Sequence, residues 1–289
     1  MKLYLNKIKK NKEIKELLEF GIINVDKPSG PTSFKTDEII KKELGLKKAA
    51  HTGTLDPKVT GVLTVLLNRA CRLLSYFIDD KEYVGVMKLH KDIGTEKLRK
   101  EMKKFEGKII QLPPIKSRVK RQEREREVKK FKLLEYDKEK REVLFIALVE
   151  AGTYIRKLIH DLGIKIGGAH MIELRRTRAG NFKENNSHNM YEIIDAIKEY
   201  KSGNEERLRD IIIPGEIIGE VLPRIEVKEE YLKKLKNGSP VFKKFIKSKL
   251  SKKILSAEKI TIFFEERFIE VAKVTNEGEI VARPEFVLN

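Results

Sequence analysis

The sequence predicts an α/β protein in two parts, a large domain of alternating strand-like and helix-like segments followed by a small β-rich domain. Three observations support this prediction. The length of 289 residues, with 40% hydrophobic residues, suits one large domain plus a small one. Strand-like and helix-like segments alternate through the first part of the chain. A break marked by Pro214-Gly215 and Pro223 then precedes three strand-like runs.

The large domain follows residues 1–18, which are rich in lysine and glutamate and predict a short charged helix or tail. Residues 21–25 are apolar and β-branched, which predicts a strand ending in a dense turn at residues 26–31. Thr32 or Ser33 can cap the helix that follows. Further elements are expected as strands over 62–67 and 83–89, a helix over 95–105, a hairpin of 128–136 with 143–149, and a helix over 154–162. The last helix would carry an apolar stripe on one side, made of Tyr154, Ile155, Leu158, Ile159 and Leu162.

The small domain begins beyond the break at residues 213–223. Its expected elements are a lysine-rich helix over 228–236, the turn Asn237-Gly238-Ser239-Pro240, and β-rich runs over 259–264, 268–274 and 279–282. The predicted division is therefore a charged segment 1–18, a large domain 19–215 and a small domain 219–289. The Pro-Gly boundary is expected to let the large domain fold by itself.

Composition restricts the class of protein. No window approaches the ~18 uninterrupted apolar residues that a membrane helix needs. The charged N-terminal segment is not expected to be a signal peptide. Cys71 is the single cysteine, so an intramolecular disulfide is excluded, and a reducing compartment such as the cytoplasm is expected. Because Cys71 falls in the apolar run 62–74, its expected role is core packing.

Charge favours a polyanionic partner. Lys and Arg total 62 against 44 for Asp and Glu, giving a net charge of +18. Nucleic acid is favoured over a membrane surface, since no basic amphipathic helix with large apolar anchors is present. The alternative is a solvated, lysine-rich surface of a heat-adapted protein, because 37% of the residues are charged against about 25% typically.

Residues 116–130 carry charge of both signs. As a helix the segment would be charged on every side, whereas as a strand it separates the two signs by face. A basic face could follow a phosphate backbone; the alternative is a solvated edge strand that uses charge to block aggregation. The basic face would consist of Lys116, Arg118, Lys120, Arg124 and Arg126, opposite Glu123, Glu125 and Glu127.

The segment His51-Thr52-Gly53-Thr54-Leu55-Asp56-Pro57, followed by Thr60-Gly61, predicts a rigid loop that presents a carboxylate. Pro57 disfavours helix at Asp56, and the glycines permit tight turns. By itself an Asp-Pro pair in a loop most often forms a simple turn.

This segment resembles the catalytic motif of the TruB and dyskerin group of pseudouridine synthases. Four further segments resemble motifs of that group in the same order: 21–33, Lys81-Glu82-Tyr83, Gly152-Thr153-Tyr154-Ile155-Arg156, and 173–178. The resemblance spans residues 21–180. It implies an α/β (α+β) catalytic domain built on a mixed sheet, which converts uridine in RNA to pseudouridine without a cofactor or a metal. The five histidines also lack short metal-ligand spacings.

Details resemble the dyskerin-type branch, which works with box H/ACA guide RNA. They are residues 85–90, Pro113-Pro114 with Val119-Lys120-Arg121, and Gly168-Ala169-His170-Met171. The small domain resembles a PUA domain, an RNA-binding β fold. The chain departs from the group's pattern at Ala50, Leu112, Lys243-Lys244-Phe245 and Arg283-Pro284.

The resemblance also implies site roles. Asp56 is the catalytic carboxylate, which either stabilises or traps the ribose at C1′ or acts as a base at the 2′ position. Tyr83 stacks on the flipped base and helps remove the C5 proton, the alternative being a packed strand tyrosine. Arg156 pairs with Asp56 and keeps it ionised and oriented, the alternative being a surface arginine. His51 and Lys27 support substrate binding; otherwise they are a neutral loop histidine and a solvated lysine.

Three functions remain open. The first is a guide-dependent synthase acting on ribosomal RNA, with H/ACA guide RNA and small core proteins as partners and with tRNA as a further substrate. The second is a stand-alone tRNA pseudouridine synthase of the same family. The third is a non-catalytic RNA-binding scaffold, for which the positive charge alone would suffice. The joint presence of Asp56, Tyr83 and Arg156 argues against the scaffold.

Overall fold

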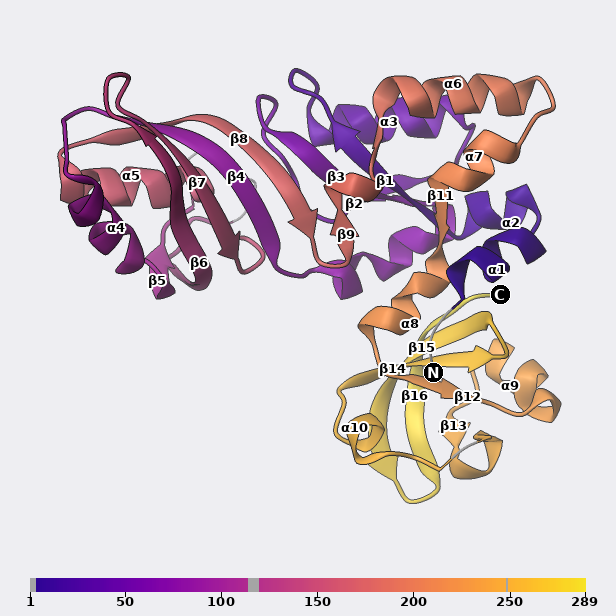
Figure 1. The fold of residues 1–289 in the computed structure, drawn as a ribbon. Helices are drawn as coiled ribbons and strands as arrows, with labels where there is room; N and C mark the ends of the chain where they lie inside the picture. Colours follow the sequence, from indigo (N-terminus) through magenta and orange to yellow (C-terminus); the bar gives the residue numbers. More distant parts are fainter. Residues whose placement is uncertain (1–3, 114–119, 248) are drawn as a thin grey trace.

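The fold contains two β-sheets, each with its own helices (Figure 1). It is described from a computed structural model for residues 4–113, 120–247 and 249–289. In Figure 1 the larger sheet runs across the upper part of the molecule and the smaller sheet lies below the end that contains β1. No helix within the described residues is long and apolar enough to cross a membrane.

The larger sheet has eleven strands, eight of which follow the order β10-β1-β3-β8-β4-β7-β6-β5. The pairs β1·β10 and β3·β8 are parallel and the other pairs are antiparallel, so the predicted mixed sheet is confirmed. Its path strands are β1 (Gly21–Lys27), β3 (Thr60–Leu67), β4 (Lys81–Leu89), β5 (Gly107–Gln111), β6 (Arg124–Asp137), β7 (Glu142–Val149), β8 (Ala169–Ala179) and β10 (His188–Asn189). The short strands β2 (Ala49–His51), β9 (Phe182–Lys183) and β11 (Ile212–Pro214) pair with β3, β8 and β1.

The helices of this part begin and end for local reasons. Thr32 caps α3, because its hydroxyl accepts a hydrogen bond from the Lys35 amide at 3.0 Å. α5 buries the stripe predicted from its spacing, including Leu158 and Leu162, and ends at Gly167 in the left-handed region with φ 89°. The helices are α3 (Ser33–Glu43), α4 (Thr95–Lys103), α5 (Ile155–Ile166), α6 (Met190–Lys201) and α7 (Glu206–Ile211), with the 3₁₀ segments η1 (Asn68–Phe77) and η2 (Glu184–Asn186).

The charged N-terminal segment forms two short helices, α1 (Leu5–Asn11) and α2 (Ile14–Glu19). Most of their charged residues are exposed, although Lys9 is half-buried, whereas Ile8 and Leu17 are buried in the two cores. The Lys12 ammonium lies 2.6 Å from the buried carboxylate of Glu216. The segment is therefore part of the folded core and not a tail.

The smaller sheet has the strand order β12-β14-β15-β16-β13. Its strands are β12 (Arg224–Glu226), β13 (Val241–Phe242), β14 (Lys259–Phe264), β15 (Arg267–Glu277) and β16 (Ile280–Val287). Its helices and 3₁₀ segments, with those of the connection, are α8 (Ile218–Val221), α9 (Leu232–Lys236), α10 (Lys252–Leu255), η3 (Gly215–Ile217), η4 (Glu229–Tyr231) and η5 (Lys243–Phe245).

The two sheets share a hydrophobic core. The ring of Phe20, just before β1, stacks on that of Phe268 in β15 with centroids 5.1 Å apart, and Phe286 of β16 packs against both. Gly215 lies at this junction, where a Cβ would come 2.5 Å from the Phe20 ring. The Pro-Gly break is thus bridged by packed aromatic rings, which argues against independent folding of the first part.

Candidate active site

The segment predicted to present a carboxylate is the loop between β2 and β3. His51 ends β2 and Thr60 begins β3. The Ser33 hydroxyl at the start of α3 accepts a hydrogen bond from the Leu55 amide at 2.8 Å and donates one to the Leu55 carbonyl at 3.1 Å. The Gly30 amide donates to the Pro57 carbonyl at 2.9 Å. These contacts fix the loop on both sides of Asp56.

Asp56 forms an ion pair with Arg156. One guanidinium nitrogen of Arg156, in the first turn of α5, donates a hydrogen bond to the Asp56 carboxylate. The two side chains are 54% and 59% exposed, so the pair lies at the surface and is open to a large substrate. The predicted pairing of these residues is confirmed.

Lys27 lies beneath the loop. Its side chain is fully buried, and its ammonium donates hydrogen bonds to the carbonyls of Pro28, Pro31 and Pro57 at 2.6, 2.8 and 3.1 Å. Burial lowers the pKa of Lys27, and the nearby Arg176 lowers it further. Lys27 therefore supports the site by tying the turn after β1 to the loop that carries Asp56, and its part in substrate binding stays a prediction.

Arg176 of β8 also supports the loop from within. It is 1% exposed, and its guanidinium donates to the Val62 carbonyl at 2.7 Å and to the Gly53 carbonyl at 2.9 Å. Gly61 allows the backbone of β8 to lie close to β3 here, because it adopts φ 97° and a Cβ there would lie 2.2 Å from the Arg176 carbonyl oxygen. The resemblance marked Arg176 only as part of a motif, without a role.

Lys81 is a second buried cation that sequence reasoning missed. It is 6% exposed at the start of β4, and its ammonium donates to the Asp79 carbonyl at 2.6 Å. A Cβ at Gly53 would lie 3.0 Å from the Lys81 side chain, so the lysine packs directly against the loop. Burial, reinforced by the charge of Arg176, lowers the pKa of Lys81 to about 8.

His51 is fixed at both ring nitrogens. Nδ1 lies 2.6 Å from the Asp37 carboxylate and Nε2 lies 3.0 Å from the Thr54 hydroxyl. A carboxylate only accepts, so Nδ1 carries a proton and, in the neutral ring, Nε2 accepts from Thr54. The histidine therefore braces the loop, and its ring nitrogens are already engaged within the protein.

Tyr83 lies on β4 between two neighbouring strands. It pairs in register with Arg176 of β8 and Ala147 of β7. Only 7% of Tyr83 is exposed, and it belongs to the main hydrophobic core. A base could therefore meet only the small exposed part of the ring.

The basic strand predicted at 116–130 is corrected in part. Lys116 and Arg118 lie outside the described residues. A strand does begin at Arg124, but Arg124 and Arg126 are half-buried, on the same face as buried Val128. Arg126 is 3.7 Å from the Glu150 carboxylate, while the acidic face is exposed. Lys120 precedes the strand and is exposed. The basic face was expected to be open, whereas the structure exposes the acidic face. The neighbouring elements decide which face is covered, and the sequence of the strand alone does not show this.

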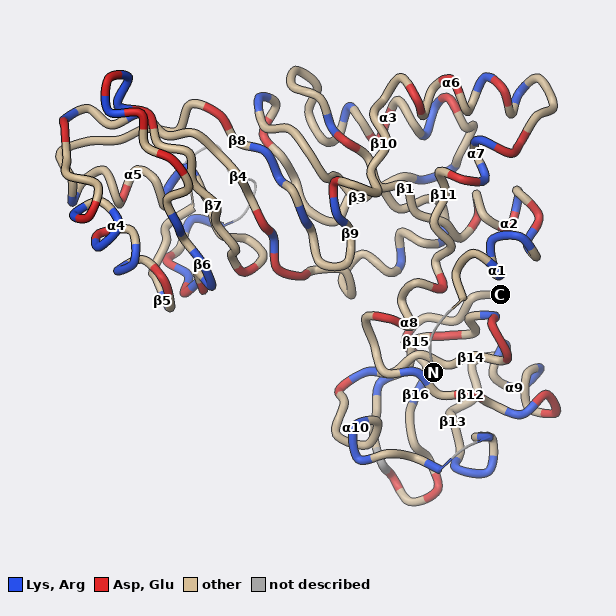
Figure 2. Tube along the Cα trace, in the orientation of Figure 1, with Lys and Arg blue, Asp and Glu red and all other residues tan. Residues whose placement is uncertain are grey.

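The described residues contain no group of three His, Cys, Asp or Glu side chains that could hold a metal ion. Lys and Arg are distributed over both sheets, interleaved with acidic residues, and do not form one continuous patch along the trace (Figure 2). The arrangement thus offers one exposed carboxylate, fixed by an arginine above and buried cations below.

Comparison with known proteins identifies the family. The model of the TruB family pseudouridylate synthase N-terminal domain matches residues 41–155, and that of the tRNA pseudouridylate synthase B C-terminal domain matches residues 156–218. A probable tRNA pseudouridine synthase B of Pyrococcus abyssi is 48% identical over 226 residues, covering 77% of this chain and 67% of the relative. The corresponding protein of Methanocaldococcus jannaschii is 42% identical over 254 residues, covering 87% and 75%. The chain thus spans about two thirds to three quarters of the length of these relatives.

Two solved structures are similar over nearly the whole chain. A Cbf5-Nop10-Gar1 complex matches with a TM-score of 0.87 and 40% identity, covering 96% of this chain and 88% of the other. An H/ACA RNP bound to a substrate RNA matches with a TM-score of 0.85 and 36% identity, covering 97% and 89%. The family models, the relatives and the fold together define an RNA pseudouridine synthase, an RNA isomerase. The chain belongs to the TruB family of pseudouridine synthases.

Proposed function

We propose that this chain is the catalytic subunit of a box H/ACA guide ribonucleoprotein and isomerises uridine in ribosomal RNA, with Asp56 as the catalytic carboxylate. The observation that carries the catalytic proposal is the exposed Asp56–Arg156 pair on a loop fixed from beneath. The similarity to the two H/ACA protein structures extends over both sheets, which supports the guide-dependent form.

The proposed reaction breaks the N1–C1′ bond of uridine, turns the uracil and forms a C5–C1′ bond, while a proton leaves C5 and N1 gains one. No atoms or electrons are gained overall, so the reaction requires no redox cofactor. Loss of N1 builds positive charge at C1′, as in glycoside hydrolysis, and a carboxylate there stabilises or traps it. In the second route, Asp56 acts as a base at the 2′ position.

The other residues prepare this step. Arg156 orients the Asp56 carboxylate through a charge-assisted hydrogen bond. Lys27 and Arg176 hold the backbone on both sides of Asp56, so little reorganisation is needed when the base arrives. Flipping a uridine out of its stack costs a few kcal/mol, and contact with the exposed part of Tyr83 would offset part of that cost.

The smaller sheet is proposed to act as a PUA-like RNA-binding domain, with residues 219–289 as its bounds and residues 19–215 as those of the catalytic part. The proposed partners of the whole protein are guide RNA, substrate RNA and the small core proteins. Lys120 stays a proposed RNA contact. We also place the protein in the cytoplasm, which its free Cys71 supports.

A stand-alone tRNA pseudouridine synthase is the second candidate, because the relatives at 48% and 42% identity carry that name. The discriminating experiment is mass spectrometry of ribosomal RNA fragments and tRNA treated with the full chain, with and without guide RNA and core proteins. Pseudouridine in ribosomal RNA only when guide RNA is present supports the first proposal. Efficient modification of tRNA by the chain alone, without modification of guided ribosomal RNA, supports the second.

A further inference from the structure

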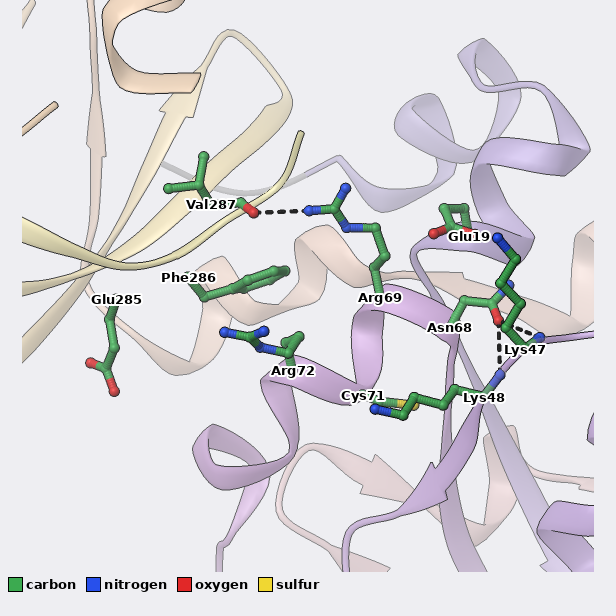
Figure 3. Close-up of a pocket in the computed structure, with 10 residues that line it drawn as sticks. All are labelled: Glu19, Lys47, Lys48, Asn68, Arg69, Cys71, Arg72, Glu285, Phe286 and Val287. Carbon is green, nitrogen blue, oxygen red and sulfur yellow. Dashed lines mark hydrogen bonds between the residues drawn. The ribbon is translucent and has the colours of Figure 1, made fainter. Parts of the chain in front are cut away.

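A pocket opens where the two sheets meet, away from the loop that carries Asp56 (Figure 3). Its cavity volume is about 400 Å³. Its walls come from four parts of the chain, namely the end of α2, the turn before β2, η1 and the end of β16. The pocket therefore exists only while the smaller sheet is docked against the larger one.

Four cations line this pocket, and the side chains of three of them form no ion pair or hydrogen bond within the described residues. Arg69 is engaged, since its guanidinium donates to the Val287 carbonyl at 3.0 Å. Lys47, Lys48 and Arg72 form no ion pair with any described carboxylate. Figure 3 shows the ammonium of Lys48 beside Cys71 and the Arg72 guanidinium beside the Phe286 ring.

The acidic groups of the pocket do not balance these cations. The partners of Glu285 are two residues that do not line the pocket. Its carboxylate lies 2.8 Å from the Lys259 ammonium and is hydrogen-bonded to Tyr76. Glu19, at the end of α2, is the other lining carboxylate. Three uncommitted cations therefore face one uncommitted carboxylate, which favours an anionic ligand.

The backbone that carries the two lysines is held in place, and so is the Arg72 guanidinium. The Asn68 side-chain oxygen accepts hydrogen bonds from the backbone amides of Lys47 and Lys48 at 3.0 and 3.1 Å. Arg72 lies over the buried Phe286 ring, 5.5 Å from its centroid, which restricts the guanidinium. Ordering the Arg72 guanidinium and the backbone of the two lysines before binding reduces the entropy lost when an anion arrives.

We propose that this pocket binds a phosphodiester group of the RNA backbone and so attaches the RNA across the junction of the two sheets. The proposal rests on the proposed function, because it takes the ligand to be the guide RNA of the proposed ribonucleoprotein. Lys48 immediately precedes the three residues of β2, whose last residue, His51, begins the catalytic loop. At about 3.3 Å per residue, Lys48 and His51 are separated by about 10 Å along β2, which is the length of about three stacked nucleotides.

The test compares the double variant Lys48→Gln/Arg72→Gln with wild type in the full-length chain. Affinity for a guide RNA hairpin is measured at several salt concentrations. Each phosphate contact adds about 0.7 to 0.9 to the salt slope, so the slope should fall by roughly 1.4 to 1.8 and the affinity by roughly 2- to 30-fold. The matched control is Lys138→Gln/Lys140→Gln, two exposed lysines at the β6–β7 turn, which β8, β4 and β7 separate from β3.

Lys48→Arg/Arg72→Lys keeps both charges and should retain most of the salt slope, while melting temperatures show that all variants are folded. A pocket variant with the same salt slope and the same guide RNA affinity as the control would overturn the proposal. This is also the result expected if the pocket binds an acidic protein or a free nucleotide instead of RNA. Failure of the proposed function is separate, since it would appear as no pseudouridine formation by wild type.

Cys71 provides a second readout inside the same pocket. As the single cysteine, it reports modification at one position, and its thiol is only partly buried. Burial raises the pKa of the Cys71 thiol to about 11, so labelling is slow enough to follow. Saturating guide RNA should slow alkylation of wild type several-fold, and an unchanged rate would contradict RNA in the pocket.

Discussion

Arg156 donates a side-chain hydrogen bond to the carboxylate of Asp56, although the two residues are 100 positions apart in the sequence. This bond joins α5 to the β2–β3 loop at the surface. Buried cations hold the backbone of the same loop from beneath. The acidic group is thus exposed while its position is fixed.

Arg156→Gln should lower single-turnover pseudouridine formation about 10- to 100-fold, since a charge-assisted hydrogen bond that orients the carboxylate is lost. The rate of the Arg156→Lys variant should lie between those of wild type and the Gln variant, because lysine retains the charge but not the planar fork. Lys165→Gln, exposed at the other end of α5, is the control. An unchanged rate in the Gln variant would show that the ion pair has no part in catalysis.

Tyr83→Phe should fold normally and slow the proton-removal step, because only the hydroxyl is removed. Tyr83→Ala should also lose about 3–5 kcal/mol of stability, since the ring is 7% exposed and belongs to the main core. Rates from single turnover and melting curves check this pair. If Phe and Ala variants are folded and equally slow, the ring does not contact the base.

Phe268→Ala should destabilise both sheets together by about 3–5 kcal/mol, because Phe268 stacks on Phe20 across the junction. The two sheets should unfold in one transition, measured by calorimetry. Phe264→Ala, at a partly buried position that packs on the core of the smaller sheet alone, should cost less. Two separate transitions in wild type would show that the shared core does not couple the sheets. For the same reason, removal of residues 219–289 is expected to lower the stability of the remainder.

Glu270 should make the protein less stable as the pH rises. Burial raises the pKa of the Glu270 carboxyl from 4.5 to about 8, and neither of its oxygens has a hydrogen-bond partner among the described residues. Between pH 4.5 and 8 the folded state holds a proton that the unfolded state has released, so stability falls over that window and is lowest above it. Glu270→Met should remove this dependence and raise the melting temperature at pH 9. An identical pH profile in the variant would show that Glu270 does not titrate this way.

Much of the fold followed from local patterns in the sequence. The Thr32 cap and the buried stripe of α5 depend on neighbouring residues, and both were predictable. The Asp56–Arg156 pair was predictable only through the family resemblance, because no local pattern joins residues 100 positions apart.

The support beneath the loop could not be read in the same way. Lys81 and Arg176 look like ordinary strand cations in the sequence, and their roles depend on which backbone carbonyls the folded chain brings to them. Gly53 and Gly61 were the available signals, since Gly53 permits close approach of the Lys81 side chain and Gly61 that of the Arg176 backbone. The open face of β6 depends similarly on the elements packed against it.

Conversion of a uridine-containing RNA by the Asp56→Asn variant tests the central claim most directly. The amide keeps nearly the same shape but removes the negative charge that the reaction needs at C1′ or the 2′ position. With the guide RNA and core proteins present, wild type should form pseudouridine, detected by mass spectrometry. The variant should form none, while binding RNA within a few fold of wild type. Substantial pseudouridine production by the purified variant would contradict the assignment of Asp56 as the catalytic carboxylate.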